Sequence, residues 1–252
     1  MIRNLMHEFI LNSLNLIQLW LYVNLFLYIV VFAMALFVNF NFNGIIVGII
    51  YFFPLIPIGV NLDNAIRFLI VSFHNTIFGI VELVIFTITI RREDITFDKK
   101  FIKQFVGHTL PIAIALIGLS FSARAITVPL LPWELVTIPF SFILGSILRV
   151  LSVYQIGTVA FKFDIIFRDK QRLKTDQLYR YLRHPSYASM MLVIFAYSLA
   201  SSNLIIGTLG MIFGWYGFHY RIIHEDKALE EQFGQEYKDY KSRTGTWFPK
   251  FF

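Results

Sequence analysis

The stretch LKTDQLYRYLRHPSY, Leu173–Tyr187, joins a basic segment of the chain to its last two apolar runs. Proline disfavours helical geometry in the residue before it and is preferred at the first helical position. His184-Pro185 therefore predicts a helix that begins at Pro185. The positive end of such a helix attracts a carboxylate or phosphate, and Arg183, His184 and Tyr187 add directional hydrogen-bond donors. We expect a binding site here, where water meets a membrane.

The composition of the whole chain is typical of a multi-span membrane protein. Of its 252 residues, 57% are hydrophobic and 15% are charged, and the mean hydropathy is +0.64, which is far from soluble usage. The chain has no Cys, so disulfides, thiolate metal ligands and a cysteine nucleophile are excluded; we expect no metal site. The formal net charge of +6 fits basic loops beside anionic lipid and does not indicate a nucleic-acid partner.

Seven apolar runs predict an all-α integral membrane fold with about seven transmembrane helices, since one span needs roughly 20 residues. The runs cover residues 9–38, 45–60, 68–90, 110–131, 132–156, 185–201 and 204–222. Pro54 and Pro57 predict a kink in the second run. We divide the chain into an N-terminal region of three spans, residues 1–109, and a core of four spans with a loop and a C-terminal tail, residues 110–252.

Lysine and arginine gather in residues 91–108, in residues 162–183 and in the tail from residue 223. Cytoplasmic loops carry an excess of these residues. We therefore expect these three segments on the cytoplasmic side of a multi-pass protein. The turns at 132–134 and 202–203, together with the N-terminus, would then lie on the other side.

Polar residues inside the third span need an explanation, because intramembrane ionisable groups are functional candidates by default. Asn75 and Glu82 are seven residues apart and share one face of the helix, and His74 is adjacent to Asn75. No motif links them to chemistry, so we favour a structural role in which neighbouring helices satisfy them. In the last span a stripe of small residues predicts close helix packing: Gly207, Gly210, Gly214 and Gly217.

A series of spaced motifs runs from Gly145 to Pro249. It comprises Gly145, Leu148, Arg149, Gly157 and Phe161, then Leu173, Thr175 and Tyr179, then RHPSY at 183–187, and finally Arg221, Glu225, Asp226, Leu229, Phe233, Gly234, Tyr237, Tyr240 and Pro249. Each motif alone is weak. Taken together, their order and spacing resemble the motif pattern of the isoprenylcysteine carboxyl methyltransferase family and its prokaryotic relatives. The resemblance implies an integral membrane methyltransferase with a C-terminal cofactor-binding region on the cytoplasmic side.

The resemblance further implies S-adenosylmethionine as the methyl donor and a lipid or lipidated substrate at the bilayer. The cofactor-binding residues that it implies are Gln171, Arg172, Leu173, Lys174, Tyr179, His184, Pro185, Ser186, Tyr187 and Glu225. A helix start and a histidine suit the carboxylate of that cofactor, and an acidic side chain suits its ammonium group or ribose hydroxyls. Arg221, one helical turn before Glu225, would face the substrate.

Methyl transfer from a sulfonium is an in-line displacement, so positioning and desolvation are the main contributions of the protein. A carboxylate acceptor is already anionic and needs orientation, which an arginine fork provides. Arg149 and Arg221 are therefore the candidates for catalysis and substrate binding. An amine acceptor would instead require a proton acceptor, for which the nearest titratable groups are His184, His219 and His224.

Several alternatives stay open at this point. The acceptor could be a phospholipid amine or a small thiol, and sterol-type membrane reductases, which use NADPH, share an RHPxY-like segment. A non-catalytic protein with the same fold is a third hypothesis. Arg149 could extend to the headgroups, and Arg221 with Glu225 could form a plain helix-surface ion pair. The chain also differs from the family pattern, with Gln177 and Ser189 where glycine is usual and Asp226 where a second glutamate is usual.

Overall fold

The computed structural model is a bundle of helices, and it describes residues 2–60, 65–89, 98–124, 128–157 and 172–250. Within these ranges we find no β-sheet. The long helices are α1 (Ile2–Val38), α2 (Phe42–Phe52), α3 (Ala65–Thr89), α5 (Leu110–Arg124), α6 (Pro132–Ile156), α7 (Pro185–Ala200) and α8 (Leu204–Phe233). Shorter segments are the 3-10 turn η1 (Phe53–Leu55), α4 (Lys99–Gln104), the π-helical turn η4 (Phe105–Thr109), the 3-10 turn η5 (Gln177–Arg180) and α9 (Gln235–Arg243).

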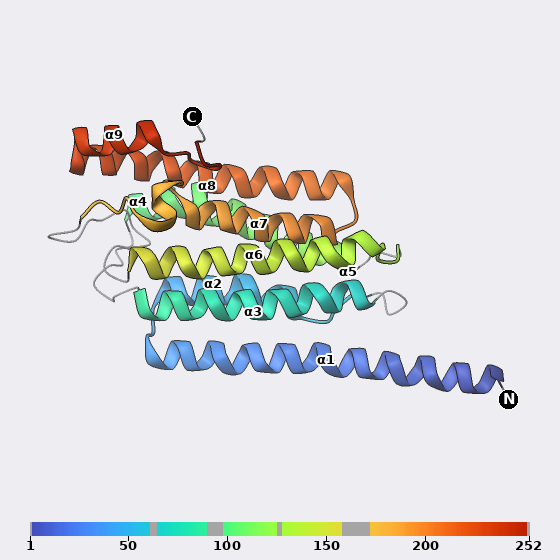
Figure 1. The fold of residues 1–252 in the computed structure, drawn as a ribbon. Coiled ribbons are helices and arrows are strands. Elements are labelled where there is room, and N and C mark those ends of the chain that lie inside the picture. Colours follow the sequence, from blue (N-terminus) through green and yellow to red (C-terminus); the bar gives the residue numbers. More distant parts are fainter. Residues whose placement is uncertain (1, 61–64, 90–97, 125–127, 158–171, 251–252) are drawn as a thin grey trace.

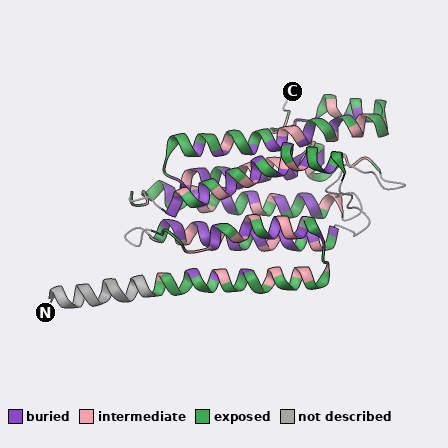
Figure 2. Ribbon diagram, turned by 180° about the vertical axis from the view of Figure 1, so that it is seen from behind, coloured by how far each residue is buried: buried purple, intermediate pink, exposed green. Residues whose placement is uncertain are grey.

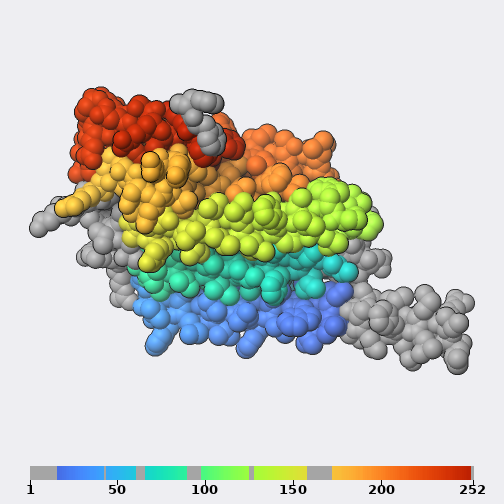
Figure 3. All heavy atoms as spheres, in the orientation of Figure 1, coloured from blue at the N-terminus to red at the C-terminus, as the bar shows by residue number. Residues whose placement is uncertain are grey.

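The long helices lie nearly side by side, with α1 along one flank of the bundle and α8 along the other (Figure 1). The most extensive contacts join α6 to α7, α1 to α3 and α5 to α8. Buried residues concentrate in the middle helices, whereas the described part of α1 is largely exposed (Figure 2). The C-terminal segment covers one end of the bundle (Figure 3). In a membrane, an exposed apolar flank such as that of α1 is suited to contact with lipid tails.

Four helical segments are long and apolar enough to cross a membrane: Leu16–Val38, Ile66–Thr89, Lys99–Arg124 and Pro132–Ile156. Gly44–Leu55 and Pro185–Ala200 are apolar but shorter. The expected all-α membrane-spanning architecture is thus confirmed. The count of seven spans stays a prediction.

Two expected spans differ from the structure. Pro54 and Pro57 do not kink a continuous helix, because α2 ends at Phe52 and passes into η1. A proline removes a backbone donor and clashes with the preceding turn, so two prolines close together stop the helix here. The fourth span begins at Lys99 rather than at residue 110, where the Asp98 carboxylate caps the helix by accepting a 2.8 Å hydrogen bond from the Phe101 amide. The division of the chain at 109/110 falls within this helical run and stays a prediction.

The glycine stripe of α8 packs as expected. A Cβ atom on Gly210 would lie 2.6 Å from the Leu119 side chain of α5, and one on Gly214 would lie 2.5 Å from Ile194 of α7. At Gly217 it would meet the carbonyl oxygen of His108 at 2.7 Å. The missing side chains therefore let α8 approach both neighbours closely.

The helix start at Pro185 is confirmed, and it lies at the same end of the bundle as α9 (Figure 1). The turn between α7 and α8 lies at the opposite end, on the side of the N-terminus (Figure 1). The polar segments 172–184 and 223–250 thus meet at one end, which we call the tail end. This end holds the candidate site.

Candidate active site

The tail folds back onto the RHPSY segment through backbone and side-chain hydrogen bonds. The Arg183 amide donates to the Gly245 carbonyl at 2.9 Å, and the Gly245 amide donates to the Tyr181 carbonyl at 3.1 Å. The Arg183 guanidinium also donates to the carbonyl of Thr244 at 2.8 Å. These bonds fix residues 181–184 against the tail, and they therefore fix the position of the first residues of α7.

His184 lies buried between two carboxylates of α8. Its Nε2 is 2.6 Å from Asp226 Oδ1, and its Nδ1 is 3.4 Å from Glu225 Oε2. Burial lowers the pKa of His184, but the hydrogen bonds with Asp226 and Glu225 outweigh burial and raise the pKa above its ordinary value. Asp226 also accepts a hydrogen bond from Tyr237. Burial raises the pKa of Asp226, yet the net direction is downward because His184 and Tyr237 stabilise the carboxylate.

Glu225 links this histidine to Arg221 and Tyr187. Glu225 Oε1 accepts a 2.7 Å hydrogen bond from Arg221 Nε and a 2.6 Å hydrogen bond from the Tyr187 hydroxyl. Burial raises the pKa of Glu225, but the charge of Arg221 and the bonds from His184 and Tyr187 bring the pKa well below its usual range. Arg221 also donates to Gln104 Oε1 at 3.0 Å. Arg221 and Glu225 therefore do form an ion pair, but it belongs to a larger network in which Arg221 is buried and the Glu225 side chain is 20% exposed.

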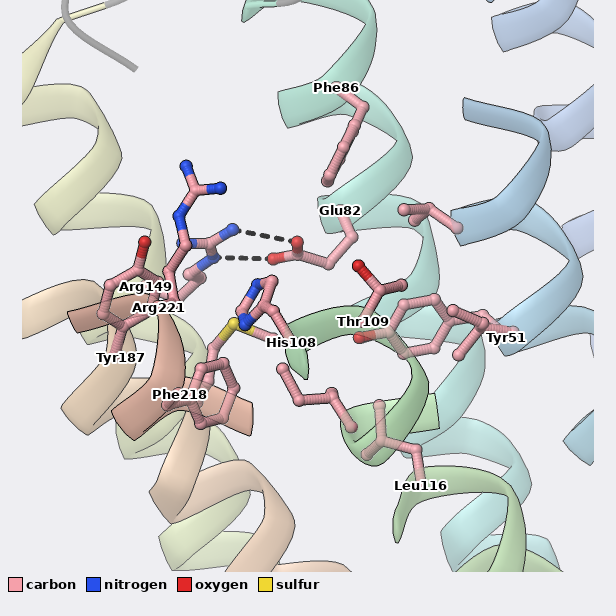
Figure 4. Close-up of a pocket in the computed structure, with 14 residues that line it drawn as sticks. Tyr51, Glu82, Phe86, His108, Thr109, Leu116, Arg149, Tyr187, Phe218 and Arg221 are labelled. Atoms are coloured by element: carbon pink, nitrogen blue, oxygen red, sulfur yellow. Dashed lines mark hydrogen bonds and ion pairs between the residues drawn. The ribbon is translucent and has the colours of Figure 1, made fainter. Parts of the chain in front are cut away.

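A cavity opens beside this network, deeper in the bundle (Figure 4). Arg149, Arg221 and Tyr187 line it from α6, α8 and α7. The remaining wall is mostly apolar and comes from α2, α3, η4 and α5: Val47, Ile50, Tyr51, Glu82, Phe86, His108, Thr109, Ile112 and Leu116. Met190 and Phe218 complete the lining. Both arginine candidates thus face one cavity that has charged groups on one side and apolar groups on the other.

Arg149 is held by Glu82 of α3. Its Nε donates to Glu82 Oε1 at 2.7 Å, its Nη2 donates to Oε2 at 2.9 Å, and its Nη1 bonds Ser186. Only 3% of Arg149 is exposed, so this side chain does not extend to the headgroups. The Glu82 carboxylate both neutralises the buried charge and orients the fork.

The structural role expected for Asn75 is confirmed as well. Its side-chain amide donates to the Tyr51 carbonyl of α2, and its Oδ1 accepts from the Tyr197 hydroxyl of α7 at 3.3 Å. His74 stacks on Phe142 of α6 with ring centroids 4.0 Å apart. Helices distant in sequence thus satisfy the Asn75 side chain and pack against the His74 ring. Glu82 differs from them because it also lines the cavity.

The remaining predicted cofactor residues fall into separate groups. Gln171 lies outside the described residues. Arg172 is exposed, and Leu173 and Lys174 are partly exposed. The Tyr179 hydroxyl donates to the Ser152 carbonyl of α6 at 3.1 Å, which anchors η5. The structure brings together His184, Pro185, Ser186, Tyr187 and Glu225.

Sequence reasoning missed four residues of this region. Asp226 is part of the motif series but was not among the predicted site residues, yet it is the carboxylate nearest to His184. Gln104, which binds Arg221, and the cavity residues His108 and Thr109 lay in a segment interpreted largely as a basic loop. An uninterrupted helical pattern from Lys99 into the fourth span would have predicted that these three residues are part of that helix.

The polar groups at the start of α7 fit a ligand that carries both a carboxylate and a cation. Arg183 Nε is buried without a hydrogen-bond partner in the described part of the chain. This donor, with the first turn of α7, can take an anionic group. Glu225, whose side chain is 20% exposed, can take an ammonium group or a hydroxyl. An amino-acid-like ligand therefore suits these residues.

Comparisons with known proteins agree with this geometry. The isoprenylcysteine carboxyl methyltransferase family profile matches residues 135–231. Protein-S-isoprenylcysteine O-methyltransferase of Dictyostelium discoideum is 35% identical over 86 residues, which cover 32% of this chain and 35% of that protein. The human protein of the same name is 28% identical over 153 residues, covering 57% of this chain and 53% of that protein. The chain thus spans about a third to just over half of the curated relatives it matches.

A solved structure of the eukaryotic intramembrane Ras methyltransferase, an isoprenylcysteine carboxyl methyltransferase, is similar in fold. The TM-score is 0.56 at 20% sequence identity, over 90% of this chain and 84% of that chain. This likeness extends over most of the N-terminal helices, where the sequence shows no resemblance. The chain shares the fold of a solved isoprenylcysteine carboxyl methyltransferase. The resemblance to that family is thus confirmed for residues 135–231, which include RHPSY and the Arg221–Glu225 pair.

Proposed function

We propose that this protein is a membrane methyltransferase that transfers a methyl group from S-adenosylmethionine to the carboxylate of a lipid-like acceptor of isoprenylcysteine type. The observation that supports it best is the Arg221–Glu225 pair, 2.7 Å between Nε and Oε1. Arg221 lines the cavity, and Glu225 contacts His184 at the start of α7. One buried ion pair thus joins a cavity suited to an apolar acceptor with a polar cluster suited to an amino-acid-like donor.

One group of residues would bind the methyl donor. His184, Arg183 and the first turn of α7 would hold the carboxylate of the donor, and Glu225 its ammonium group or ribose hydroxyls. When bound, S-adenosylmethionine supplies an electrophilic methyl group. We place this cluster on the cytoplasmic side, because the tail that covers it is rich in lysine and arginine.

Arg221 is the residue that would orient the acceptor carboxylate. A guanidinium presents a planar pair of donors that matches a carboxylate. Arg149 lines the same cavity, but both oxygens of the Glu82 carboxylate bind it and neutralise its charge, whereas Arg221 is held by one oxygen of Glu225 and by the neutral amide of Gln104. Arg149 would therefore hold a fixed position in the wall. Apolar walls from α2, α3 and α5 would receive the tail of the acceptor and exclude water from the reacting carboxylate.

The carboxylate acceptor is favoured over an amine because a carboxylate does not have to lose a proton before it attacks. In the polar cluster both ring nitrogens of His184 are engaged by Asp226 and Glu225, so neither nitrogen is free to accept a proton from an amine. A carboxylate acceptor needs no base. The phospholipid-amine and small-thiol alternatives, like the NADPH-dependent reductase, stay possible outcomes of the experiment below.

The test begins with cofactor binding, measured by calorimetry on the detergent-purified chain with S-adenosylmethionine and, separately, with NADPH. We expect saturable binding of S-adenosylmethionine alone, and its loss in the His184→Ala/Glu225→Ala double variant. Tyr154→Ala, a substitution of an exposed residue of α6, is the matched control and should bind normally. Binding of NADPH alone would replace this proposal with a reductase.

The second step is methyl-ester formation on S-farnesyl N-acetylcysteine, followed by mass spectrometry. This compound combines a carboxylate with a long apolar thioether tail. We expect an ester that mild base removes. Cofactor binding without any ester would contradict the proposed acceptor, and phosphatidylethanolamine and an alkyl thiol would then be the next compounds to test.

A further inference from the structure

A groove runs between α4 and α8 at the tail end of the bundle, where Figure 1 shows α4 beside the last turns of α8. Lys100 and Lys103 line it from α4, which lies outside the segment that matches the family profile. Tyr220, His224 and Ala228 line it from α8. Since these three residues are four positions apart, they share one face of that helix. Among the described residues, the lining of the groove has none in common with that of the cavity.

The lining of the groove has an excess of positive charge. Lys100 and Lys103 are exposed and three positions apart, so they are neighbours on the helix surface, with Cβ atoms about 5–6 Å apart. Glu231 is an acidic residue of the lining, and it pairs with Lys227 of its own helix at 3.8 Å. Two lysines beside one carboxylate that already has a partner attract an anion.

Exposed apolar side chains continue both walls of the groove towards the middle of the bundle. Val106 and Leu110 follow α4 and are 54% and 39% exposed. Tyr216 and Ile212 precede Tyr220 on the same face of α8 and are 52% and 54% exposed. We call Val106, Leu110, Ile212 and Tyr216 the apolar strip. Because exposed apolar side chains of a membrane protein contact lipid, the groove lies where acyl chains end and headgroups begin.

Close helix contacts place the two halves of the apolar strip at the same level. A Cβ atom on Gly107 would lie 2.5 Å from the Tyr220 ring, and one on Gly217 would lie 2.7 Å from the His108 carbonyl oxygen. The two helical runs are therefore antiparallel and in close contact just below the groove. One acyl chain can thus contact both halves of the strip while its headgroup reaches the lysines.

We propose that this groove binds the phosphate of an anionic phospholipid whose acyl chains lie against the apolar strip. The ammonium groups of Lys100 and Lys103 would form charge-assisted hydrogen bonds with the phosphate oxygens. The rings of Tyr220 and His224, with centroids 4.3 Å apart, would form the opposite wall. Basic pockets between membrane helices suit such headgroups. A free phosphate would use only the charge of the groove, and phosphatidylcholine would bring a cation of its own to the lysines.

The groove also contacts the group that holds Arg221. Gln104 lines the groove next to Lys103 and is 5% exposed, and its Oε1 accepts a 3.0 Å hydrogen bond from Arg221. A lipid that joins α4 to α8 would therefore hold Gln104 in place against Arg221. We infer that anionic lipid increases methyl transfer, a consequence that rests on the proposed function, in which Arg221 orients the acceptor.

The experiment first measures lipid binding to the full chain. The protein is reconstituted with equal amounts of phosphatidylglycerol and phosphatidylcholine of matched acyl chains, and the lipids that it retains in detergent are identified by native mass spectrometry. We expect the wild type to prefer phosphatidylglycerol about tenfold, from the attraction of two lysines. Lys100→Gln/Lys103→Gln should reduce the preference to about twofold or less, whereas Lys100→Arg/Lys103→Arg should preserve it.

The matched control is Lys238→Gln/Arg243→Gln, which removes the same charge from exposed positions of α9 and should keep the preference. A wild type without preference would overturn the inference, as would equal losses in the groove variant and the control. Displacement of the lipid by millimolar glycerol 3-phosphate would show that the groove takes a free phosphate and would overturn the lipid assignment.

Methyl-ester formation on S-farnesyl N-acetylcysteine is then measured in phosphatidylcholine with and without phosphatidylglycerol. We expect kcat/KM to rise about fivefold with the anionic lipid in the wild type and the control, but not in Lys100→Gln/Lys103→Gln. Selective lipid binding without any ester in either membrane would refute the proposed function alone. Ester formation that does not depend on the lipid, together with selective binding, would refute the coupling through Gln104.

Discussion

The two ends of the bundle use buried arginines in different ways. At the far end, opposite the tail end, Arg67 donates to Glu134 at 2.9 Å and to the Ala200 and Pro129 carbonyls at 3.2 and 3.3 Å. Arg124 donates there to the carbonyls of Ile58 and Pro54 at 3.0 and 2.6 Å. At the tail end, Arg149 and Arg221 bind side-chain oxygens, and both line the cavity.

The difference separates structural arginines from functional candidates. The backbone carbonyls that Arg67 and Arg124 bind belong to loops and helix ends, which these two arginines fix. Burial does not distinguish the two pairs, since Arg124 is 2% exposed and Arg221 is 4% exposed. A carboxylate partner does not distinguish them either, since Glu134 binds Arg67 as Glu82 binds Arg149. Contact with the cavity does, because of these four arginines Arg149 and Arg221 line it and can interact with a ligand there.

The largest effect on stability is expected at the far end. Arg67→Ala removes one member of a buried ion pair and leaves Glu134 charged without its partner, a change that costs about 3–5 kcal/mol. We expect a strongly lowered unfolding midpoint in detergent but normal methyl transfer per folded molecule. The double variant Arg67→Met/Glu134→Leu should recover most of the loss, because well-packed apolar residues often replace a buried pair at little cost. Failure of methyl transfer in folded Arg67→Ala protein would contradict the comparison.

The largest effect on activity is expected at the tail end. Arg221→Ala should lower kcat/KM for the carboxylate acceptor on the order of 10²- to 10³-fold, the size seen when one preorganised charge-stabilising donor is removed. Initial rates, corrected for the folded fraction, provide the measurement. Arg124→Ala is the matched control, an equally buried arginine at the other end. If both variants lost activity equally per folded molecule, Arg221 would have no special role.

The pH dependence of stability tests the cluster around His184. The pKa of His184 is raised from 6.5, so its contribution is complete below about pH 6.5 and is lost as the pH rises through the folded value. The pKa values of Asp226 and Glu225 are lowered from 3.8 and 4.5, so their contributions are complete above these values and are lost as the pH falls through the folded ones. The cluster therefore stabilises the folded protein most between about pH 4.5 and 6.5.

His184→Asn should remove the extra stability that the cluster provides in this pH range. Charged hydrogen bonds contribute about 1.5–3 kcal/mol, and the difference in unfolding free energy between wild type and variant should be largest inside the window and shrink on both sides. Chemical denaturation across about pH 2 to 9 measures it, so that the range includes the loss of the carboxylate contributions. A difference for His184→Asn that does not vary with pH would show that the three groups do not titrate together.

Local sequence signals predicted much of the fold. Pro185 marks the start of α7 because proline favours the first helical position. The expected turn at 132–134 is wrong, since for the same reason Pro132 is the first residue of α6. The glycine stripe predicted the close approach of α8. The network centred on Glu225 was partly predictable as well, since Arg221 lies one turn away on the same helix.

The cavity wall could not be predicted in this way. Glu82 and Arg149 are 67 residues apart, and no periodicity within one helix reveals a partner on another. The π turn at His108 also has no local signal, because it depends on the close contact of α8 at Gly107 and Gly217. Tertiary packing, rather than local propensity, decides these positions.

The smallest effect concerns Gln177, one of the residues that differ from the family pattern. Its φ is +54°, a left-handed conformation that costs a non-glycine residue about 1–2 kcal/mol. Its side chain is exposed. Gln177→Gly should therefore raise the unfolding free energy by about 0.5–1 kcal/mol after the added entropy of glycine in the unfolded chain is subtracted. Gln232→Gly, at an exposed position inside α8, should lower it by a similar amount. Equal destabilisation by both substitutions would mean that the backbone at Gln177 is not strained, and that glycine is usual there in the family for another reason, such as close approach to the donor.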